Sequence, residues 1–316
     1  MAGLRNLKVL ILGNTQVGDI GLEHLAGLSR LNALILDGTQ ISDEGLAHLD
    51  GLTELSELYL HNTEIGDSGL KYLAGLTKLR FLLLNGTQVR QEGLQHLAGL
   101  TELRNLNLSD TRVTDEGIKH LAGLRRLGSV HLKNTPIGNK GLGYLAELTE
   151  LGWLQLDNTQ VSDTGLKHLA ALSKLKVLAV SGTQVGDEGL KHLAGLTEMQ
   201  YLHLNDTQVS DEGLKHLAGF EKLETLTLHN TLVTDEGLKH LAGLAKLYFL
   251  DLSGTQVSEE GLNNPAGLTG LTFIHLDHTQ ISKEGVARLR RARRHCVIEL
   301  VPRRNGTRTT GSHTVR

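Results

Sequence analysis

Hydrophobic residues recur along this chain with a fixed period of 24 residues. The motif starts at Leu4 and continues without insertion or deletion to Arg291, which gives twelve copies. One ten-residue stretch, DEGLKHLAGL, occurs identically at 187–196 and 235–244. A fixed period in this range is the sequence signature of a solenoid, in which similar units stack side by side.

Each copy, numbered here from position 1 to position 24, predicts one short strand followed by one short helix. Positions 7 and 9, which are Leu10 and Leu12 in the first copy, alternate with polar or variable residues, as is typical of a strand. In the stretch 234–243, TDEGLKHLAG, apolar residues three apart follow a threonine and two acidic residues and precede a glycine. This pattern favours an N-capped helix of about two turns with a glycine C-cap.

Seven apolar columns, at positions 1, 4, 7, 9, 14, 19 and 22, can be buried only against adjacent copies. Position 18 is glycine in all twelve copies, from Gly21 to Gly285, although glycine weakens a helix. We therefore expect close backbone contact between neighbouring copies there. Pro265, which replaces a core leucine, predicts a shortened helix in the eleventh copy. Because strands stack about 4.8 Å apart and helices are about 10 Å wide, the stack must curve with its strands on the inner face.

These residues resemble a known family. The stretch LxxLxLxxTxV, carried by Leu7, Leu10, Leu12, Thr15 and Val17, is similar to the leucine-rich repeat. The following (S/T)DEGLKHLAGL resembles the bacterial, cysteine-containing and ribonuclease-inhibitor-like subtypes with helical outer faces. One departure is threonine at all twelve places where the family usually has Asn or Cys; we expect its hydroxyl still to bond to backbone after the strand. The resemblance implies an α/β fold, a right-handed horseshoe with a parallel β-sheet on the concave face and short α-helices on the convex face.

Domain limits follow from the repeat and from the charge. We expect one leucine-rich repeat domain over residues 1–301, with twelve repeats at 4–291 and a C-terminal cap at 292–301. A basic tail at 302–316 is predicted to be disordered. From Arg288 onward nine arginines stand against one acidic residue, Glu299, whereas residues 1–287 hold 23 Lys or Arg against 34 Asp or Glu. This acidic body argues against nucleic-acid binding.

The chain shows no sequence signal for a membrane. No apolar run reaches the roughly 18 residues of a membrane span, and the N-terminus, MAGLRNLKVLIL, lacks the flanks of a secretory signal. We therefore expect no membrane association and favour a cytoplasmic location. The first copy has no evident polar cap, which a solenoid needs, so self-association through the N-terminal end is a further expectation.

The residues that vary between copies are the candidates for binding, because the rest of each copy is uniform. Positions 6 and 8 flank a core leucine of each strand and point into the concavity. These 24 sites hold six of the ten aromatic residues. Aromatic side chains among directional polar groups are typical of a surface that binds a protein or peptide. The candidate partner-binding residues on and beside the strands are Tyr59, Phe81, His131, Trp153, Tyr201, His203, His229, Phe249, Asp251, Phe273, His275 and Asp277.

Two other functions are open. Asp251, Ser253 and His275 have the composition of a hydrolytic triad, but an open curved sheet offers no obvious pocket or oxyanion donors. A structural spacer without a ligand is the other. Eight of the sixteen histidines share position 21 with Tyr, Asn and Arg, which favours hydrogen bonding at a helix flank over metal ligation. We therefore predict a non-enzymatic protein-binding module without metal or cofactor.

Overall fold

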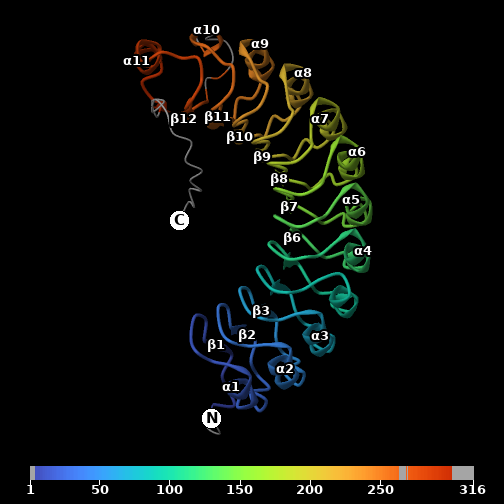
Figure 1. The fold of residues 1–316 in the computed structure, drawn as a ribbon. Coiled ribbons are helices and arrows are strands. Elements are labelled where there is room, and N and C mark those ends of the chain that lie inside the picture. Colours follow the sequence, from blue (N-terminus) through green and yellow to red (C-terminus); the bar gives the residue numbers. More distant parts are fainter. Residues whose placement is uncertain (1–3, 263–267, 269, 301–316) are drawn as a thin grey trace.

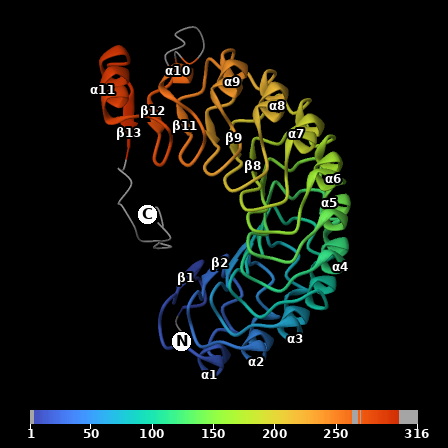
Figure 2. The ribbon, with the colours of Figure 1, turned by 45° about the horizontal axis from the view of Figure 1, so that its top comes forward.

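The computed structural model, which describes residues 4–262, 268 and 270–300, is an open arc of strand–helix units (Figure 1). Within these residues, thirteen parallel strands form one sheet in the order β1 to β13. The sheet lines the inner side of the arc and the helices line the outer side, and the two ends of the described chain lie at opposite ends of the arc (Figures 1 and 2). The predicted parallel sheet, its curvature and its concave position are confirmed.

Each repeat contributes one strand of three residues, at positions 6 to 8. Consecutive strands pair with an offset of 24 residues, as Val9 does with Ala33 and Trp153 with Val177. Residues of the same position therefore form columns across the whole sheet. The strands are β1 (Val9–Ile11), β2 (Ala33–Ile35), β3 (Glu57–Tyr59), β4 (Phe81–Leu83), β5 (Asn105–Asn107), β6 (Ser129–His131), β7 (Trp153–Gln155), β8 (Val177–Ala179), β9 (Tyr201–His203), β10 (Thr225–Thr227), β11 (Phe249–Asp251), β12 (Phe273–His275) and β13 (Val297–Glu299).

In the described part of the chain, six of the twelve outer segments consist of one α-helical turn followed by one 3₁₀ turn, so the predicted two turns are present there but are only partly α-helical. The outer segments are α1 (Asp19–Glu23), α2 (Asp43–Leu46) with η1 (Ala47–Leu49), α3 (Asp67–Leu70) with η2 (Lys71–Leu73), η3 (Gly93–Leu97), α4 (Asp115–Ile118) with η4 (Lys119–Leu121), α5 (Asn139–Leu145), α6 (Asp163–Leu166) with η5 (Lys167–Leu169), α7 (Asp187–Leu193), α8 (Asp211–Leu214) with η6 (Lys215–Leu217), α9 (Asp235–Leu238) with η7 (Lys239–Leu241), α10 (Glu259–Leu262) and α11 (Lys283–Ala292).

The predicted N-caps are confirmed at some segments only, because Thr114 and Ser162 make no capping hydrogen bond and several other segments begin at a glycine. The predicted glycine C-cap is wrong. The side chains of Ser210 and Thr234 accept hydrogen bonds from backbone N–H groups in the first turns of α8 and α9. At the other end, Ala242 is the C-cap residue of η7 and keeps right-handed helical backbone. The glycines with positive φ are Gly38, Gly86, Gly182 and Gly254, all of which follow strands. The tight 3₁₀ turn thus ends the segment without a left-handed residue.

The left-handed residues stand at position 11, in the turn after each strand. The φ angle there lies between 52° for Asn230 and 70° for Gly254. The residues that fill this column are Asn, Asp, Gly and His, which tolerate this backbone best. Directly after it, the threonine hydroxyl at position 12 donates to the backbone carbonyl three residues earlier, as Thr159 does to Leu156 at 2.6 Å. The predicted bond from threonine to backbone is confirmed.

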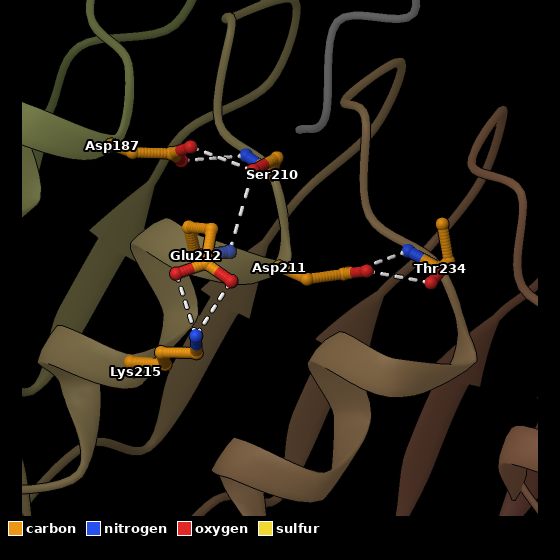
Figure 3. Close-up of polar contacts among 6 residues, drawn as sticks. All are labelled: Asp187, Ser210, Asp211, Glu212, Lys215 and Thr234. Atoms are coloured by element: carbon orange, nitrogen blue, oxygen red, sulfur yellow. Dashed lines mark hydrogen bonds and ion pairs between the residues drawn. The ribbon is translucent and has the colours of Figure 1, made fainter.

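Aspartates at position 16 of eight repeats each bond to the following repeat along the outer rim. Figure 3 shows two such steps, from Asp187 to Ser210 and from Asp211 to Thr234. In the first, Oδ1 of Asp187 accepts from the Ser210 N–H at 2.8 Å and Oδ2 accepts from the Ser210 hydroxyl at 2.6 Å. The position-18 glycine leaves room for this carboxylate, because a Cβ on Gly189 would lie 2.5 Å from Oδ1 of Asp163. The close approach predicted at this glycine is present, but at Gly189 the nearest atoms are side-chain atoms of the preceding repeat and not its backbone.

The C-terminal end is closed by α11 and β13. Strand β13 pairs with β12, and Ile298 is buried against the core. The guanidinium of Arg293 donates to the Leu268 carbonyl at 2.7 Å and to the Leu262 carbonyl at 3.3 Å. The predicted helix shortening at Pro265 and the predicted tail at 302–316 lie outside the described residues.

Candidate functional site

The concave surface has its smallest side chains in the eighth repeat. That repeat places Val177, Ala179, Ser181 and Gly182 where the seventh and ninth repeats carry aromatic, amide, histidine or acidic side chains. Val177 and Ala179 are buried, at 8% and 5% exposure, because longer neighbours stand over them. An open hollow of about 400 Å³ results, here called the repeat-eight hollow; it is lined by Lys133, Gln155, Asp157, Asn158, Ala179, Ser181, Gly182, His203, Asn205 and Asp206.

A chain of hydrogen bonds fixes the side of the hollow toward the N-terminus. Ser129 Oγ lies 2.8 Å from Nε2 of His131, whose Nδ1 lies 3.0 Å from Oε1 of Gln155. Gln155 donates in turn from Nε2 to Asp157 at 3.0 Å. Since the Gln155 amide nitrogen donates to that carboxylate, its Oε1 accepts from Nδ1–H of His131. The four side chains, from β6 to the end of β7, therefore hold one another in place.

Trp153 stands beside this chain and is the most exposed of the Phe, Tyr and Trp residues on the described strands. Its residue is 47% exposed, and its ring centroid lies 5.6 Å from that of His131. A ring held by a fixed neighbour loses little side-chain entropy when a partner covers it. The structure therefore brings two of the predicted residues, Trp153 and His131, into contact, which the sequence alone does not predict.

The opposite side of the hollow comes from β9. His203 lies 3.3 Å through Nδ1 from the Thr227 hydroxyl, and burial lowers the pKa of its imidazole although the nearby Asp157 charge opposes that effect. His203 is therefore neutral at pH 7. Tyr201 donates its hydroxyl to Glu224 at 3.2 Å, and this hydrogen bond raises the pKa of the phenol. Asp157 and His203 line the same hollow from the seventh and ninth repeats, so one ligand in it can contact both sides.

A second aromatic cluster lies in the last repeats. The rings of Phe249 and Phe273 are stacked, with centroids 5.5 Å apart and planes 14° apart, and His275 contacts both at 5.4 and 4.9 Å. Nε2 of His275 lies 3.1 Å from Glu299 in the cap. This cluster is four strands from Trp153, roughly 19 Å along the sheet. The predicted aromatic residues of the C-terminal half therefore lie in two clusters, with Tyr201 and His203 between them.

The arrangement of the last repeats gives the hydrolase alternative no support. Ser253 is buried at 5% exposure, and Oδ1 of Asp251 accepts from the Ser253 backbone N–H at 2.9 Å. His275 directs Nε2 toward Glu299. The three residues make the contacts of a packed surface and a turn, in place of the serine–histidine–aspartate relay that hydrolysis requires.

The remaining predicted residues are dispersed. Tyr59 on β3 donates to Glu57 at 3.2 Å, and burial raises the pKa of its phenol. Phe81 on β4 is 37% exposed beside a separate hollow of about 510 Å³. His229 donates its backbone N–H to Asn205, and the Asp277 carbonyl accepts from the Gly254 N–H. Both therefore support turns beside the strands.

Sequence comparison identifies the family. The chain matches the family described as "Leucine-rich repeat region" over residues 57–299 and that described as "Leucine Rich repeat" over residues 3–26. The first match spans more than half of the 316 residues. The chain belongs to the leucine-rich repeat family. No curated protein matches it.

Solved leucine-rich repeat structures share the architecture. An internalin (inlF) of Listeria monocytogenes is 25% identical with a TM-score of 0.73, and the alignment covers 94% of this chain and 87% of the internalin. A Leptospira interrogans leucine-rich repeat protein is 20% identical with a TM-score of 0.64, covering 93% and 81%. The ectodomain of the Arabidopsis thaliana receptor kinase GASSHO1/SCHENGEN3, solved with CASPARIAN STRIP INTEGRITY FACTOR 2, is 17% identical with a TM-score of 0.54, covering 94% and 42%.

The leucine-rich repeat fold is in general a scaffold for protein–protein interaction. In the described part of this leucine-rich repeat chain, no three His, Cys, Asp or Glu side chains form a group that could hold a metal ion. No described helix is long and apolar enough to cross a membrane. The histidines of position 21 lie on the outer segments, for example His192 in α7.

Several residues of the repeat-eight hollow were not predicted. Gln155, Asp157 and Asp206 carry polar groups into it, and Ala179 and Gly182 make it by being small. The signal for the polar residues was available, because positions 8, 10 and 11 face the concavity in every repeat. The signal for the hollow itself was the run of small residues in one repeat between two with large ones.

The first repeat exposes apolar side chains. Leu4 and Val9 are each 50% exposed, Ile11 is 70% exposed and Ile20 is 80% exposed. These are the residues that the predicted self-association would bury, and that association stays a prediction.

Proposed function

We propose that this leucine-rich repeat protein binds a partner protein on its concave face, without catalysis, and that the contact centres on the repeat-eight hollow and Trp153. The observation that carries the proposal is the exposed Trp153 ring, which lies on the same strand as Gln155 of the hollow and against the hydrogen-bonded ring of His131. Exposed aromatic anchors beside pockets are the usual centres of binding energy at interfaces.

The fold supports this use of the surface. Strands β6 to β9 are paired in register, and the hydrogen-bonded side chains between them are fixed before a partner arrives. A rigid surface pays little ordering cost on binding. The complex of the plant receptor ectodomain, which shares only the fold, is consistent with this use of a leucine-rich repeat arc.

The test uses peptides selected by the wild-type protein from a random library displayed on phage. Trp153→Ala and Tyr201→Ala should each weaken the selected peptides by about tenfold or more, as loss of an interface anchor does. Leu232→Ala is the matched control, because Leu232 is 54% exposed but lies after β10, away from the hollow. Circular dichroism should show the same fold in all variants.

The proposal fails if the library yields no specific binder. It also fails if the selected peptides bind the Trp153→Ala variant as tightly as the Leu232→Ala variant. Either result would show that the concave face does not bind a partner through Trp153, and it would support the alternative of a structural spacer.

A further inference from the structure

At one edge of the repeat-eight hollow no side chain projects from the backbone, because the residue there is Gly182. This glycine interrupts a row of hydrogen-bonded side-chain amides. Asn134 donates to Asp110, and Asn158 donates through Nδ2 to Oδ1 of Asn134 at 2.8 Å. The next place in the column is Gly182, where a Cβ would collide with Oδ1 of Asn158. The row of amides therefore ends with an acceptor oxygen directed over the hollow.

Carboxylates stand on both sides of this acceptor. Asp157 accepts through Oδ1 from the Ser181 N–H at 3.0 Å and through Oδ2 from Gln155, so its orientation is fixed. Asp206, in the repeat beyond Gly182, accepts from Asn230 at 2.9 Å through Oδ1. A carboxylate offers about four lone-pair positions, so both groups can accept further bonds.

The charge of the lining selects a cation. Asp157 and Asp206 are opposed by one cationic side chain, Lys133, and His203 is neutral at pH 7 because burial lowers its pKa. A ligand carboxylate would meet two like charges, which is unfavourable. A hollow of about 400 Å³ lies within the usual range of roughly 300 to 1,000 Å³ for ligand sites.

We propose that the repeat-eight hollow receives the guanidinium of an arginine in an extended segment of the partner. A guanidinium carries five N–H donors in one plane and is weakly hydrated, so it can bond to acceptors on opposite sides of a hollow at once. Here those acceptors are Asp157, Asn158 Oδ1 and Asp206, while Ala179 offers an apolar floor to the methylenes. This inference rests on the proposed function, because it assumes a partner on the concave face.

The test removes the positive charge of the peptide's arginine, or the negative charges of the two aspartates, while keeping the shape of each side chain. In peptides selected on the wild-type protein, we expect one conserved arginine, and its replacement by citrulline, which has the same outline but no charge, should weaken binding about tenfold. In the double variant Asp157→Asn and Asp206→Asn, arginine and citrulline peptides should bind alike. Asp50→Asn, an exposed residue outside the hollow, is the matched control and should keep the tenfold preference.

Gly182→Asn provides a second, independent variant. Asn already occupies this left-handed position in other repeats, at Asn134 and Asn158, so the fold should persist, with Asn158 turning as Asn134 does. The new side chain should occupy the hollow and remove the arginine preference. Unchanged preference in this variant would overturn the placement.

The outcomes separate the two proposals. Two results would overturn the arginine proposal but leave the concave binding site supported. In the first, the peptides depend on Trp153 but lose no more than twofold in affinity when citrulline replaces arginine. In the second, the peptides carry a conserved Asp or Glu whose contribution to binding is lost in Lys133→Ala. Peptides that bind without any dependence on Trp153 would overturn the proposed function itself.

Discussion

Oδ1 of Asp163 occupies the space that a side chain on Gly189 would need: a Cβ there would lie 2.5 Å from the oxygen. The same oxygen accepts from the Gly186 N–H at 2.6 Å, at the start of α7. The aspartate of one repeat and the glycine of the next therefore form one device, which fixes the spacing between repeats. This relationship gives the invariant glycine of the sequence a physical cause.

Gly189→Ala should destabilise the protein by about 1–3 kcal/mol, the usual cost of overpacking. The gain in helix propensity, up to about 1 kcal/mol, works in the opposite direction and is outweighed. Gly243→Ala is the matched control, since a Cβ there meets nothing within 4 Å and the backbone is not left-handed. Urea unfolding should show the control to be neutral or slightly stabilised, by up to about 1 kcal/mol. Equal stability of the two variants would contradict the steric account.

Thr159→Val should cost about 1 kcal/mol, the net value of one buried hydrogen bond. The Thr159 hydroxyl donates to the Leu156 carbonyl at 2.6 Å, and the residue is 7% exposed. Valine keeps the shape but leaves that carbonyl without its hydroxyl donor. Thr149→Val, at an exposed position, should stay within about 0.5 kcal/mol of the wild type in the same urea titration. A Thr159→Val protein as stable as this control would remove the role proposed for the column.

Much of the fold could be predicted, because it depends on a pattern of residue types that recurs in all twelve copies. The alternation around Leu10 and Leu12 identified the strands, and the glycine column identified the contact between repeats. The left-handed turn at position 11 was not predicted, although Asn, Asp, Gly and His at one column are a signal for it. The glycine at position 24 suggests a C-cap, but the 3₁₀ turn before it needs no left-handed residue.

The candidate site could be predicted only in part, because it depends on differences between neighbouring repeats. The strand period placed Trp153 and Tyr201 on the concave face. It could not show that Ala179 and Gly182 open a hollow between them, since a small residue is informative only beside its larger neighbours. Nor could it show that His275 turns toward Glu299, because that contact depends on where the cap strand β13 pairs.

The burial of His203 should make stability depend on pH. Burial lowers the pKa of His203 below its usual 6.5, so below about pH 6.5 the unfolded chain binds a proton that the folded chain binds only at lower pH. The free energy of unfolding therefore falls as the pH falls through this range. In His203→Gln, urea unfolding at pH 7.5 and pH 5.0 should show a smaller loss than in the wild type. His24→Gln, on the exposed outer side, is the control, and identical pH dependence in both variants would contradict the assignment.

The C-terminal cap should depend on Arg293. Its guanidinium bonds to the carbonyls of Leu268 and Leu262, and charged hydrogen bonds to buried groups contribute about 1.5–3 kcal/mol each. Arg293→Ala should therefore loosen the pairing of β12 with β13, which deuterium exchange would detect as faster labelling of residues 270–300 with unchanged labelling of residues 76–124. Arg294→Ala, the exposed neighbour, should label like the wild type. Because each repeat contacts only its neighbours, the loss should stay at this end of the arc. Faster exchange throughout the chain would show that the cap stabilises the whole sheet, and no change would show that the arginine bonds carry little of its stability.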